Sequence, residues 1–343
     1  MALSALDLAN EAVAAKQDLT QDQAAAALAV IMAGEASDSQ ISALLLGLRD
    51  KGETVEELAG LAETMRSLAT EVRPQRHDLL DTCGTGGGRR TFNISTTAAL
   101  IAAAAGCAVA KHGNRTSTGL SGSADVLEAL GAKFELSAED EATLIDEIGF
   151  GFMFAPAHHA ATRYVVPVRK ALGVPTIFNL LGPLTNPAGA SKQLIGVPQP
   201  ASIELVAGAL VRLGTEHALV VSSEDGLDEI STSGPTHVAE IREDQIERYV
   251  LTPEQFGVEP GSDEEISGGG PEINAQIIGE IFSGAGGSRR DIAALNAGAA
   301  IYVAGRADSI ADGFELALEA IDSGAAAQTL ADYLRRSAEL SGQ

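Results

Sequence analysis

Residues 77–114 read HDLLDTCGTGGGRRTFNISTTAALIAAAAGCAVAKHGN, and their pattern predicts how the larger part of the chain folds. The short apolar segment 77–83 is typical of a strand, and the glycines of 84–88 are typical of a loop. A helix capped by Ser and Thr is expected from about residue 95, and 107–113 is again typical of a strand. Strands that alternate with helices indicate an α/β domain with a mostly parallel sheet.

The rest of the chain extends this pattern in both directions. Residues 1–73 are typical of helices, with Thr54 and Glu57 at the spacing of a capping box and Ser37 or Asp38 as a second cap. A small helical domain therefore precedes the α/β domain. Further helices are expected at 122–132, 137–150, 202–214 and from about 273 onward, further strands at 150–156, 192–198 and 217–223, and edge strands within 235–257.

The composition excludes several classes of protein. A length of 343 residues suggests about two domains, and 45% hydrophobic residues exclude wholesale disorder. The chain has 23 basic and 47 acidic residues, a net charge of −24, which argues against binding nucleic acid or an acidic membrane. A small anionic ligand remains compatible with this charge because distant charges are screened by salt.

The location of the protein is expected to be cytoplasmic. The N-terminal residues lack the basic and apolar regions of a signal peptide, and the apolar run 98–110 is too short to span a bilayer. Cys83 and Cys107 form no CxxC pair and are expected to be small buried residues in a reducing compartment.

The glycine loop is the first feature with chemical content. Glycines let the backbone approach a ligand, and the amides at the start of the following helix, near Ser95, form an anion site. The loop matches neither a Walker A motif nor GxGxxG. The pattern indicates a phosphate cradle, with a tight turn and an ordinary helix cap as the alternative.

A second polar segment follows the strand at 107–113. Lys111 to Arg115 and the hydroxyl-rich residues up to Ser123 lie where open α/β sheets bind ligands. Lys supplies a compact charge for phosphate, and Asn114 can donate and accept hydrogen bonds. The alternative is a solvated loop in which Ser123 is only a helix cap.

Two further clusters carry charge. His158 and His159 lack a Cys or carboxylate at ligand spacing, so a zinc site is not expected there. Arg163, further along the chain, could bind a carboxylate; the alternative is an ordinary surface arginine. Asp228 and Glu229 follow an expected strand and suit Mg²⁺, unless they are a chance pair in an acidic chain. Together these features describe a pocket for a phosphorylated, Mg²⁺-bound ligand beside a carboxylate-bearing one.

At this level of detail the chain resembles a known family, the anthranilate phosphoribosyltransferases of tryptophan biosynthesis. The resemblance rests on motifs that run in order to about residue 235: CGTGG, TFNIST, KHGNR, SGSADVLEALG, HHAATR, GVPTIFNLLGPLTNPA (173–188) and GLDE. It implies an α/β fold of the nucleoside phosphorylase and phosphoribosyltransferase class, with a mostly parallel central sheet flanked by helices. A small helical domain, 1–73 with helices near 165–190, would be hinged to a large domain, 74–343.

The resemblance also implies a homodimer with its active site between the domains, and it leaves open an association with anthranilate synthase. The substrates would be 5-phosphoribosyl 1-pyrophosphate (PRPP) and anthranilate, and the cofactor Mg²⁺. Ser95, Asp228 and Glu229 would hold the metal, and Gly84, Asn114 and Arg163 would meet anthranilate. PRPP would contact Gly84, Gly87, Gly88, Thr91, Asn93, Ile94, Ser95, Thr96, Lys111, His112, Gly113, Asn114, Arg115, Thr116, Ser117, Thr118, Gly119 and Ser123.

The expected reaction is displacement at the anomeric carbon of the ribose, with Lys111, His112 and Arg163 as the catalytic candidates. Lys111 would offset charge on the departing pyrophosphate, and His112 is either a general base or a structural residue.

The chain departs from the family pattern at two places. The glycine loop reads GTGGG-Arg89-Arg90, one residue shorter than usual and without the usual Asp at residue 88. The second loop has Thr118 and Gly119 where two serines are usual. A pyrimidine-nucleoside phosphorylase-like enzyme and a non-catalytic nucleic-acid-binding relative remain as alternative functions.

Overall fold

The N-terminal part of the chain consists of four helices that are each capped by a hydroxyl side chain. The computed structural model describes residues 3–116, 119–262 and 264–342. Ser4, Thr20, Ser37 and Thr54 each accept a hydrogen bond from the third residue of the helix they precede, completing four capping boxes. The helices are α1 (Ala5–Ala14), α2 (Gln21–Met32), α3 (Asp38–Lys51) and α4 (Val55–Ser67). The helices expected before residue 73 are confirmed.

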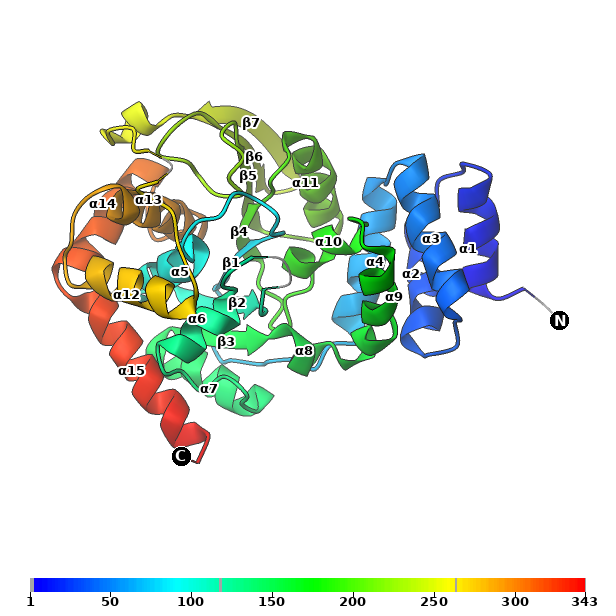
Figure 1. The fold of residues 1–343 in the computed structure, drawn as a ribbon, viewed down its shortest axis with the longest axis horizontal. Coiled ribbons are helices and arrows are strands. Elements are labelled where there is room, and N and C mark those ends of the chain that lie inside the picture. The colour runs from blue at the N-terminus through cyan, green and yellow to red at the C-terminus, as the bar shows by residue number, and fades with distance from the viewer. Residues whose placement is uncertain (1–2, 117–118, 263, 343) are drawn as a thin grey trace.

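A seven-stranded sheet forms the centre of the rest of the molecule (Figure 1). Its order is β3-β2-β1-β4-β5-β6-β7; the first five strands run parallel, and the last two form an antiparallel hairpin at the edge. The mostly parallel sheet and the edge strands within 235–257 are therefore confirmed. The strands are β1 (Leu79–Gly84), β2 (Ala108–Gly113), β3 (Phe150–Phe154), β4 (Lys192–Gly196), β5 (His217–Ser223), β6 (Thr236–Arg242) and β7 (Gln245–Leu251).

Helices cover both faces of the sheet along β1 to β5, so these strands are mostly buried, whereas the edge strand β7 is largely exposed. On β5, Leu219 and Val221 belong to the core beneath the C-terminal helices, whereas Val220 faces the core shared with the N-terminal helices. The first face carries α5 (Ile94–Ala104), α12 (Pro271–Phe282), α13 (Ser288–Val303), α14 (Ile310–Asp322) and α15 (Ala325–Leu340). The second carries α11 (Ile203–Arg212), which packs on α4 (Figure 1). α7 (Ala138–Ile148) packs directly on β2 and β3, and α6 (Ser123–Ala129) contacts α12.

The segment between β3 and β4 returns to the N-terminal helices. Val165, Val168 and Phe178 are buried in the same apolar cluster as α1 to α4. This packing links the segment physically to the helical lobe, while the residue boundary between the domains stays a prediction. The segment contains α8 (Ala155–His158), the 3-10 helix η1 (Ala160–Tyr164), α9 (Val166–Leu172), α10 (Phe178–Leu181) and η2 (Gly182–Leu184). Two further 3-10 turns are η3 (Pro200–Ser202) and η4 (Pro253–Phe256).

The strand order reverses direction beside β1. The chain moves from β1 through β2 to β3 on one side and through β4 to β5 on the other. Parallel α/β sheets bind ligands at the carboxyl ends of their strands where the order reverses in this way. The loops that follow β1, β2 and β5 are the polar segments singled out in the sequence.

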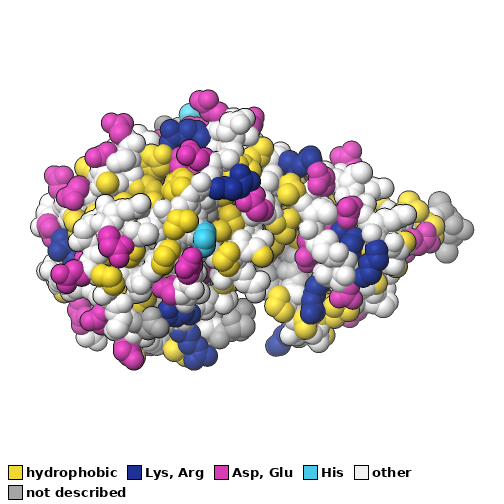
Figure 2. Space-filling model, turned by 90° about the horizontal axis from the view of Figure 1, so that it is seen from above, with side chains coloured by type: hydrophobic (Ala, Val, Ile, Leu, Met, Phe, Trp, Pro, Cys, Tyr) yellow, Lys and Arg dark blue, Asp and Glu magenta, His cyan; other side chains and the backbone are white. Residues whose placement is uncertain are grey.

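Two lobes of unequal size are visible from above, with a notch between them (Figure 2). On this face, basic side chains occur in separate groups among acidic ones rather than in a continuous stripe. No helix in the described part of the chain has both the length and the apolar character needed to cross a membrane.

Candidate functional site

The glycine loop leaves β1 at Gly84 and is held by main-chain hydrogen bonds along its length. Thr85 N–H donates to the Gly196 carbonyl at 2.9 Å, and Arg89 N–H donates to the Gly226 carbonyl at 3.2 Å. At the far end of the loop, the N–H of the buried Phe92 donates to the Ile266 carbonyl at 3.3 Å. Gly86 and Gly87 have φ of 71° and 90°, which favours glycine. The loop is therefore a fixed turn with strained positions taken by glycine.

Asp228 fills the space that three of the glycines leave open. A Cβ at Gly84 would lie 2.7 Å from Asp228 Oδ2, and a Cβ at Gly88 would overlap the same carboxylate. At Gly196, the end of β4, a Cβ would overlap the main-chain carbonyl of Asp228. Glycine at residue 88, where the family pattern has Asp, thus leaves room for the Asp228 carboxylate in this shorter loop.

Asp228 and Glu229 form a carboxylate pair that is poorly solvated. Burial raises the pKa of Glu229 to about 8, with repulsion from Asp228 as the second cause; Lys111 and the Ser95 N–H oppose the shift. Burial also raises the pKa of Asp228. Two adjacent carboxylates in a half-buried loop are stabilised in their charged form by a divalent cation with oxygen ligands. With the Ser95 hydroxyl near Lys111, these oxygens fit Mg²⁺ chemically.

Lys111 brings a buried positive charge to the same place. Its side chain is 1% exposed, and its Nζ donates to the Thr82 carbonyl and lies 3.4 Å from Thr82 Oγ1 and 3.5 Å from Ser95 Oγ. The ammonium therefore lies where β1, β2 and the start of α5 meet. This junction joins the glycine loop, the second loop and the carboxylate pair into one site.

Asp81 supports this junction from beneath. It is fully buried and accepts hydrogen bonds from His112 N–H at 3.1 Å and from Asn186 Nδ2 at 2.8 Å. Burial raises the pKa of Asp81 to about 6, although Lys111 and both hydrogen bonds oppose that shift. The sequence reasoning gave neither Asp81 nor Asn186 a role; their presence in the DTCGTGG and GPLTNP motifs was the available signal.

The thiol of Cys83 lies next to this cluster. Cys107 is buried as expected, but Cys83 is only partly buried, contrary to the expectation. Burial raises the pKa of the Cys83 thiol to about 12, so it is not a nucleophile at neutral pH.

His112, His158 and His159 each place a ring nitrogen within hydrogen-bond distance of a main-chain carbonyl. His112 is 3% exposed, and its Nδ1 lies 3.2 Å from the Gly182 carbonyl; its ring meets that of His159 edge to face at 5.2 Å. Burial, together with His159, lowers the pKa of His112 to about 3, so the ring is neutral. His112 Nε2 is buried and has no hydrogen-bond partner among the described residues.

His158 and His159 bond to other groups. His159 Nε2 lies 3.0 Å from the Thr185 carbonyl, whereas His158 Nε2 lies 2.8 Å from a carboxylate oxygen of the buried Glu141. Glu141 arrives from α7, a partner that sequence spacing did not reveal. In residues 3–116, 119–262 and 264–342, no three His, Cys, Asp or Glu side chains group together in a way that could hold a metal ion.

The second loop is ordered by Asp125 and by the Ser123 hydroxyl. Asp125 accepts from the N–H groups of Thr116 at 3.0 Å and Gly122 at 2.8 Å, so it caps α6. The alternative role of Ser123 as helix cap is wrong, because its hydroxyl exchanges hydrogen bonds at 3.2 Å with the main chain of Asn114. The Thr116 hydroxyl accepts from Gly119 N–H at 2.7 Å. Ser117 and Thr118 lie outside the described residues.

Several expected ligand contacts can be specified further. Arg115 forms ion pairs with Asp125 at 3.0 Å and with Glu128 at 2.7 Å, so its positive charge is largely neutralised by these two carboxylates. The side chains of Ile94 and Thr96 are buried, which leaves only their main chain for a ligand. Gly113 is crowded by Ser123 and Phe152, which explains glycine there.

Asn93 is tied to other parts of the protein. Its Nδ2 donates to the Ser121 carbonyl at 3.1 Å, and its Oδ1 accepts from Asn274 of α12 at 2.8 Å. The side chain therefore joins the glycine loop to the second loop.

The two arginine regions differ in their contacts. Arg163 lies on η1, is exposed, donates to the Tyr164 hydroxyl at 2.9 Å and lies over the Tyr164 ring at 4.8 Å. These contacts do not connect it to the glycine loop. Arg89 contacts the Asp225 carbonyl at 3.1 Å, whereas Arg90 is exposed and pairs with none of the described residues.

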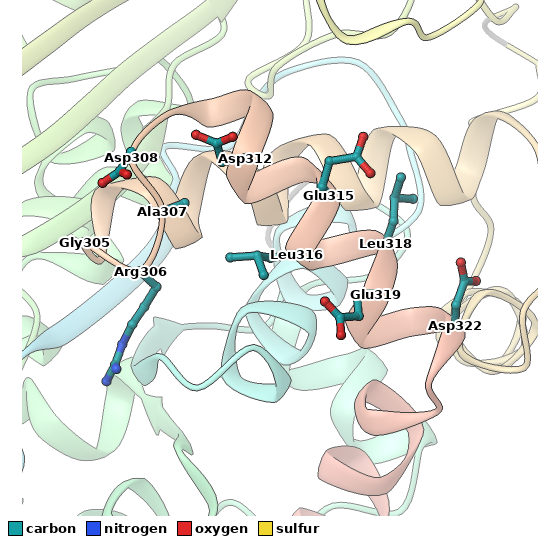
Figure 3. A pocket seen from close by; sticks show the side chains of 10 residues that line it. All are labelled: Gly305, Arg306, Ala307, Asp308, Asp312, Glu315, Leu316, Leu318, Glu319 and Asp322. Atoms are coloured by element: carbon teal, nitrogen blue, oxygen red, sulfur yellow. The ribbon is translucent and has the colours of Figure 1, made fainter.

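A separate groove of about 700 Å³ lies beside α14 and the turn that precedes it (Figure 3). Its lining residues belong to none of the segments expected to bind substrate, and its acidic side chains would repel a phosphorylated ligand. The acidic side chains that line the groove are Asp308, Asp312, Glu315, Glu319 and Asp322.

Two family models match this chain. The model described as "Glycosyl transferase family, a/b domain" matches residues 76–327, and that described as "Glycosyl transferase family, helical bundle domain" matches residues 9–69. Among curated relatives, the chain is 51% identical over 319 residues to the anthranilate phosphoribosyltransferase of Symbiobacterium thermophilum, covering 93% of this chain and 94% of the relative. It is 55% identical over 302 residues to that of Laribacter hongkongensis, covering 88% of each.

Solved structures give the same result. Anthranilate phosphoribosyltransferase from Thermus thermophilus superposes with a TM-score of 0.91 at 43% identity, covering 96% of this chain and 99% of that one. The Saccharomyces cerevisiae enzyme in complex with PRPP and Mg superposes with a TM-score of 0.89 at 28% identity, covering 97% and 98%. The yeast enzyme is also known in complex with 4-fluoroanthranilate, with a TM-score of 0.87 at 26% identity and the same coverage.

Proposed function

The chain belongs to the anthranilate phosphoribosyltransferase family and has that family's activity in tryptophan biosynthesis, and from this premise we propose which of its residues do the work. The proposal is that PRPP binds at the carboxyl ends of β1, β2 and β5, against the glycine loop. The observation that carries it is the convergence of Lys111, Ser95 and the Asp228–Glu229 pair around Gly84 and Gly88. Main-chain amides, one cation and two carboxylates are what a metal-bound diphosphate requires.

We propose Ser95, Asp228 and Glu229 as the residues that hold Mg²⁺, because their oxygens fit a hard divalent ion. When bound, the metal would neutralise charge on the pyrophosphate. A relative of known structure carries PRPP and Mg together, which supports this assignment.

The protein's own part in the reaction is to orient two substrates and to stabilise charge. The aromatic amine of anthranilate attacks the anomeric carbon of the ribose, the C–O bond to pyrophosphate breaks, and the amine then loses a proton. Lys111 and the loop amides stabilise the negative charge that develops on the leaving group. Orientation of the two reactants contributes a further ~7–11 kcal/mol.

A strong general base is not required by this chemistry. The amine becomes a strongly acidic ammonium only after the new bond has formed, so a weak acceptor suffices. His112, with a pKa lowered to about 3 by burial, offers an unprotonated Nε2 that no described group occupies. We propose His112 as the proton acceptor, with a purely structural role as the alternative.

The experiment that tests the activity is a fluorescence assay of anthranilate loss with PRPP and Mg²⁺. Loss that requires all three components is expected. Turnover of thymidine with phosphate instead would favour the pyrimidine-nucleoside phosphorylase alternative, and a gel shift at low salt would favour a nucleic-acid-binding role.

Arg163→Ala is expected to raise the KM for anthranilate about 30-fold and to leave the KM for PRPP within twofold. A guanidinium that holds a carboxylate in two charged hydrogen bonds contributes about 2 kcal/mol, which corresponds to this factor. Steady-state kinetics with each substrate varied in turn measures both constants.

Arg335→Ala is the matched control for Arg163→Ala, because Arg335 is an exposed, ion-paired arginine on α15. It is expected to change neither constant. Equal rises in both KM values for Arg163→Ala would remove Arg163 from the anthranilate site and leave it as the partner of Tyr164.

We propose that the chain forms a homodimer through its helical lobe. Leu3 and Leu8, before and on α1, are 53% and 54% exposed, and Val166 on α9 is 50% exposed. These exposed apolar side chains would be covered in a dimer formed through this lobe. A solution mass measurement tests the dimer. The cytoplasmic location and the association with anthranilate synthase stay predictions.

A further inference from the structure

The C-terminal helices carry no motif with chemical content, yet one of them reaches the metal-binding segment. Asn296 lies on α13 and is fully buried. Its Oδ1 accepts from Ile230 N–H at 2.9 Å, and its Nδ2 donates to the Ile230 carbonyl at 2.9 Å. A third bond runs from Nδ2 to the Ile292 carbonyl of its own helix, also at 2.9 Å. All the strong hydrogen-bonding groups of this side chain are therefore used.

Asn296 acts on the peptide bond that directly follows Glu229. The Ile230 N–H belongs to the peptide bond that joins Ile230 to Glu229, so Asn296 fixes the peptide plane attached to the Glu229 Cα. Both main-chain groups of Ile230 are held by one side chain, which fixes the direction of the chain as well as its position.

The turn on both sides of this peptide is fixed by other groups. Asp225 accepts from Leu227 N–H at 3.3 Å and from the Ser231 hydroxyl at 2.6 Å, and it also bonds the Ser223 hydroxyl. These bonds close the turn after β5 but do not reach the Glu229–Ile230 peptide. Asp228 is confined by Gly84, Gly88 and Gly196. Among the described residues, Asn296 is the side chain whose hydrogen bonds hold the peptide that follows Glu229.

We infer that Asn296 is a positioning residue that holds the Asp228–Glu229 carboxylate pair in the geometry that binds the divalent cation. The inference rests on the proposed function, because it takes these two residues as metal ligands. Mg²⁺ requires nearly ideal octahedral geometry, so a small displacement of one ligand weakens its binding strongly. Outer residues that orient metal ligands commonly contribute 10–100-fold to metal affinity.

The test uses Asn296→Asp in the full-length protein. Asp keeps an acceptor for the Ile230 N–H but loses both Nδ2 donors. The Mg²⁺ concentration that gives half-maximal activity is expected to rise at least about 10-fold. The KM for anthranilate should stay within twofold. As a measurement independent of turnover, Mn²⁺ binding in the presence of PRPP, followed by the loss of the free-ion electron paramagnetic resonance signal, should weaken by a similar factor.

Ile301→Ala is the matched control, because Ile301 is a fully buried apolar residue further along the same helix. It should lower the midpoint of thermal unfolding without moving the Mg²⁺ requirement. If Asn296→Asp lowers that midpoint and leaves both metal measurements unchanged, Asn296 is a structural residue and the inference is wrong.

Two further results are decisive. If Asn296→Asp does not fold, Asn296→Ser is measured in the same way, and failure of both where Ile301→Ala folds assigns Asn296 to folding alone. Wild-type protein that shows no Mg²⁺-dependent consumption of anthranilate would instead overturn the proposed function, so the two failures are distinguishable.

Discussion

Replacing Asp228 and Glu229 together by Asn and Gln is expected to lower kcat/KM by at least about 1,000-fold and to abolish the response to Mg²⁺. The two carboxylates lie beside the glycine loop, with Asp228 against Gly84 and Gly88 and Glu229 accepting from Ser95 N–H. Amides keep the size and the oxygen atoms but remove the charge that holds a hard cation. A loss of this size corresponds to about 4 kcal/mol of transition-state stabilisation.

The same double variant is expected to fold normally. Two like charges that are half-buried beside each other repel, so the neutral amides should leave the midpoint of thermal unfolding unchanged or raise it in the absence of metal. Glu224→Gln is the matched control, since Glu224 directly follows β5 but is exposed and pairs with His237 at 3.1 Å. Activity that is retained and still depends on Mg²⁺ would exclude the pair as the metal ligands.

Local sequence patterns were sufficient for the elements and for the loops between them. The alternation of apolar strands with helices placed β1, α5 and β2 within a few residues, because each signal depends on neighbours in the chain. The expected Ser or Thr cap of α5 is wrong, because Asn93 precedes the helix and no side chain caps it. The capping box from Thr54 to Glu57 is present for the same reason. The polar segments after β1, β2 and β5 meet at one edge because parallel strands share their direction.

Contacts between distant segments could not be predicted in this way. The bonds from Asn186 to Asp81, from Asn274 to Asn93 and from Asn296 to Ile230 join residues that are 105, 181 and 66 positions apart. Asparagine has little preference for such positions in a sequence, so only the packed fold reveals them. The pairing of His158 with Glu141 could not be predicted for the same reason.

The replacement of Lys111 by Met is expected to lower kcat/KM for PRPP about 100- to 1,000-fold, with a much smaller effect on the KM for anthranilate. Met preserves most of the aliphatic stem and removes the ammonium group. Lys111 is 1% exposed and its charge lies among Thr82, Ser95 and the carboxylates, where little water screens it. A charge in this position interacts with a diphosphate far more strongly than a surface lysine does.

The loss of the ammonium should also affect the fold. The Thr82 carbonyl loses its donor, and Asp81 loses the positive charge that opposes the rise in its pKa, so stability should fall by about 1–3 kcal/mol. Lys192→Met separates this effect from catalysis, because Lys192 begins β4, at the amino end of the parallel strands and away from the glycine loop, and donates to the Ala304 carbonyl at 3.2 Å. If both variants lose stability but only Lys111→Met loses PRPP turnover, the charge of Lys111 acts on the substrate. Full turnover in Lys111→Met would show that the buried lysine serves only to join β1 to β2.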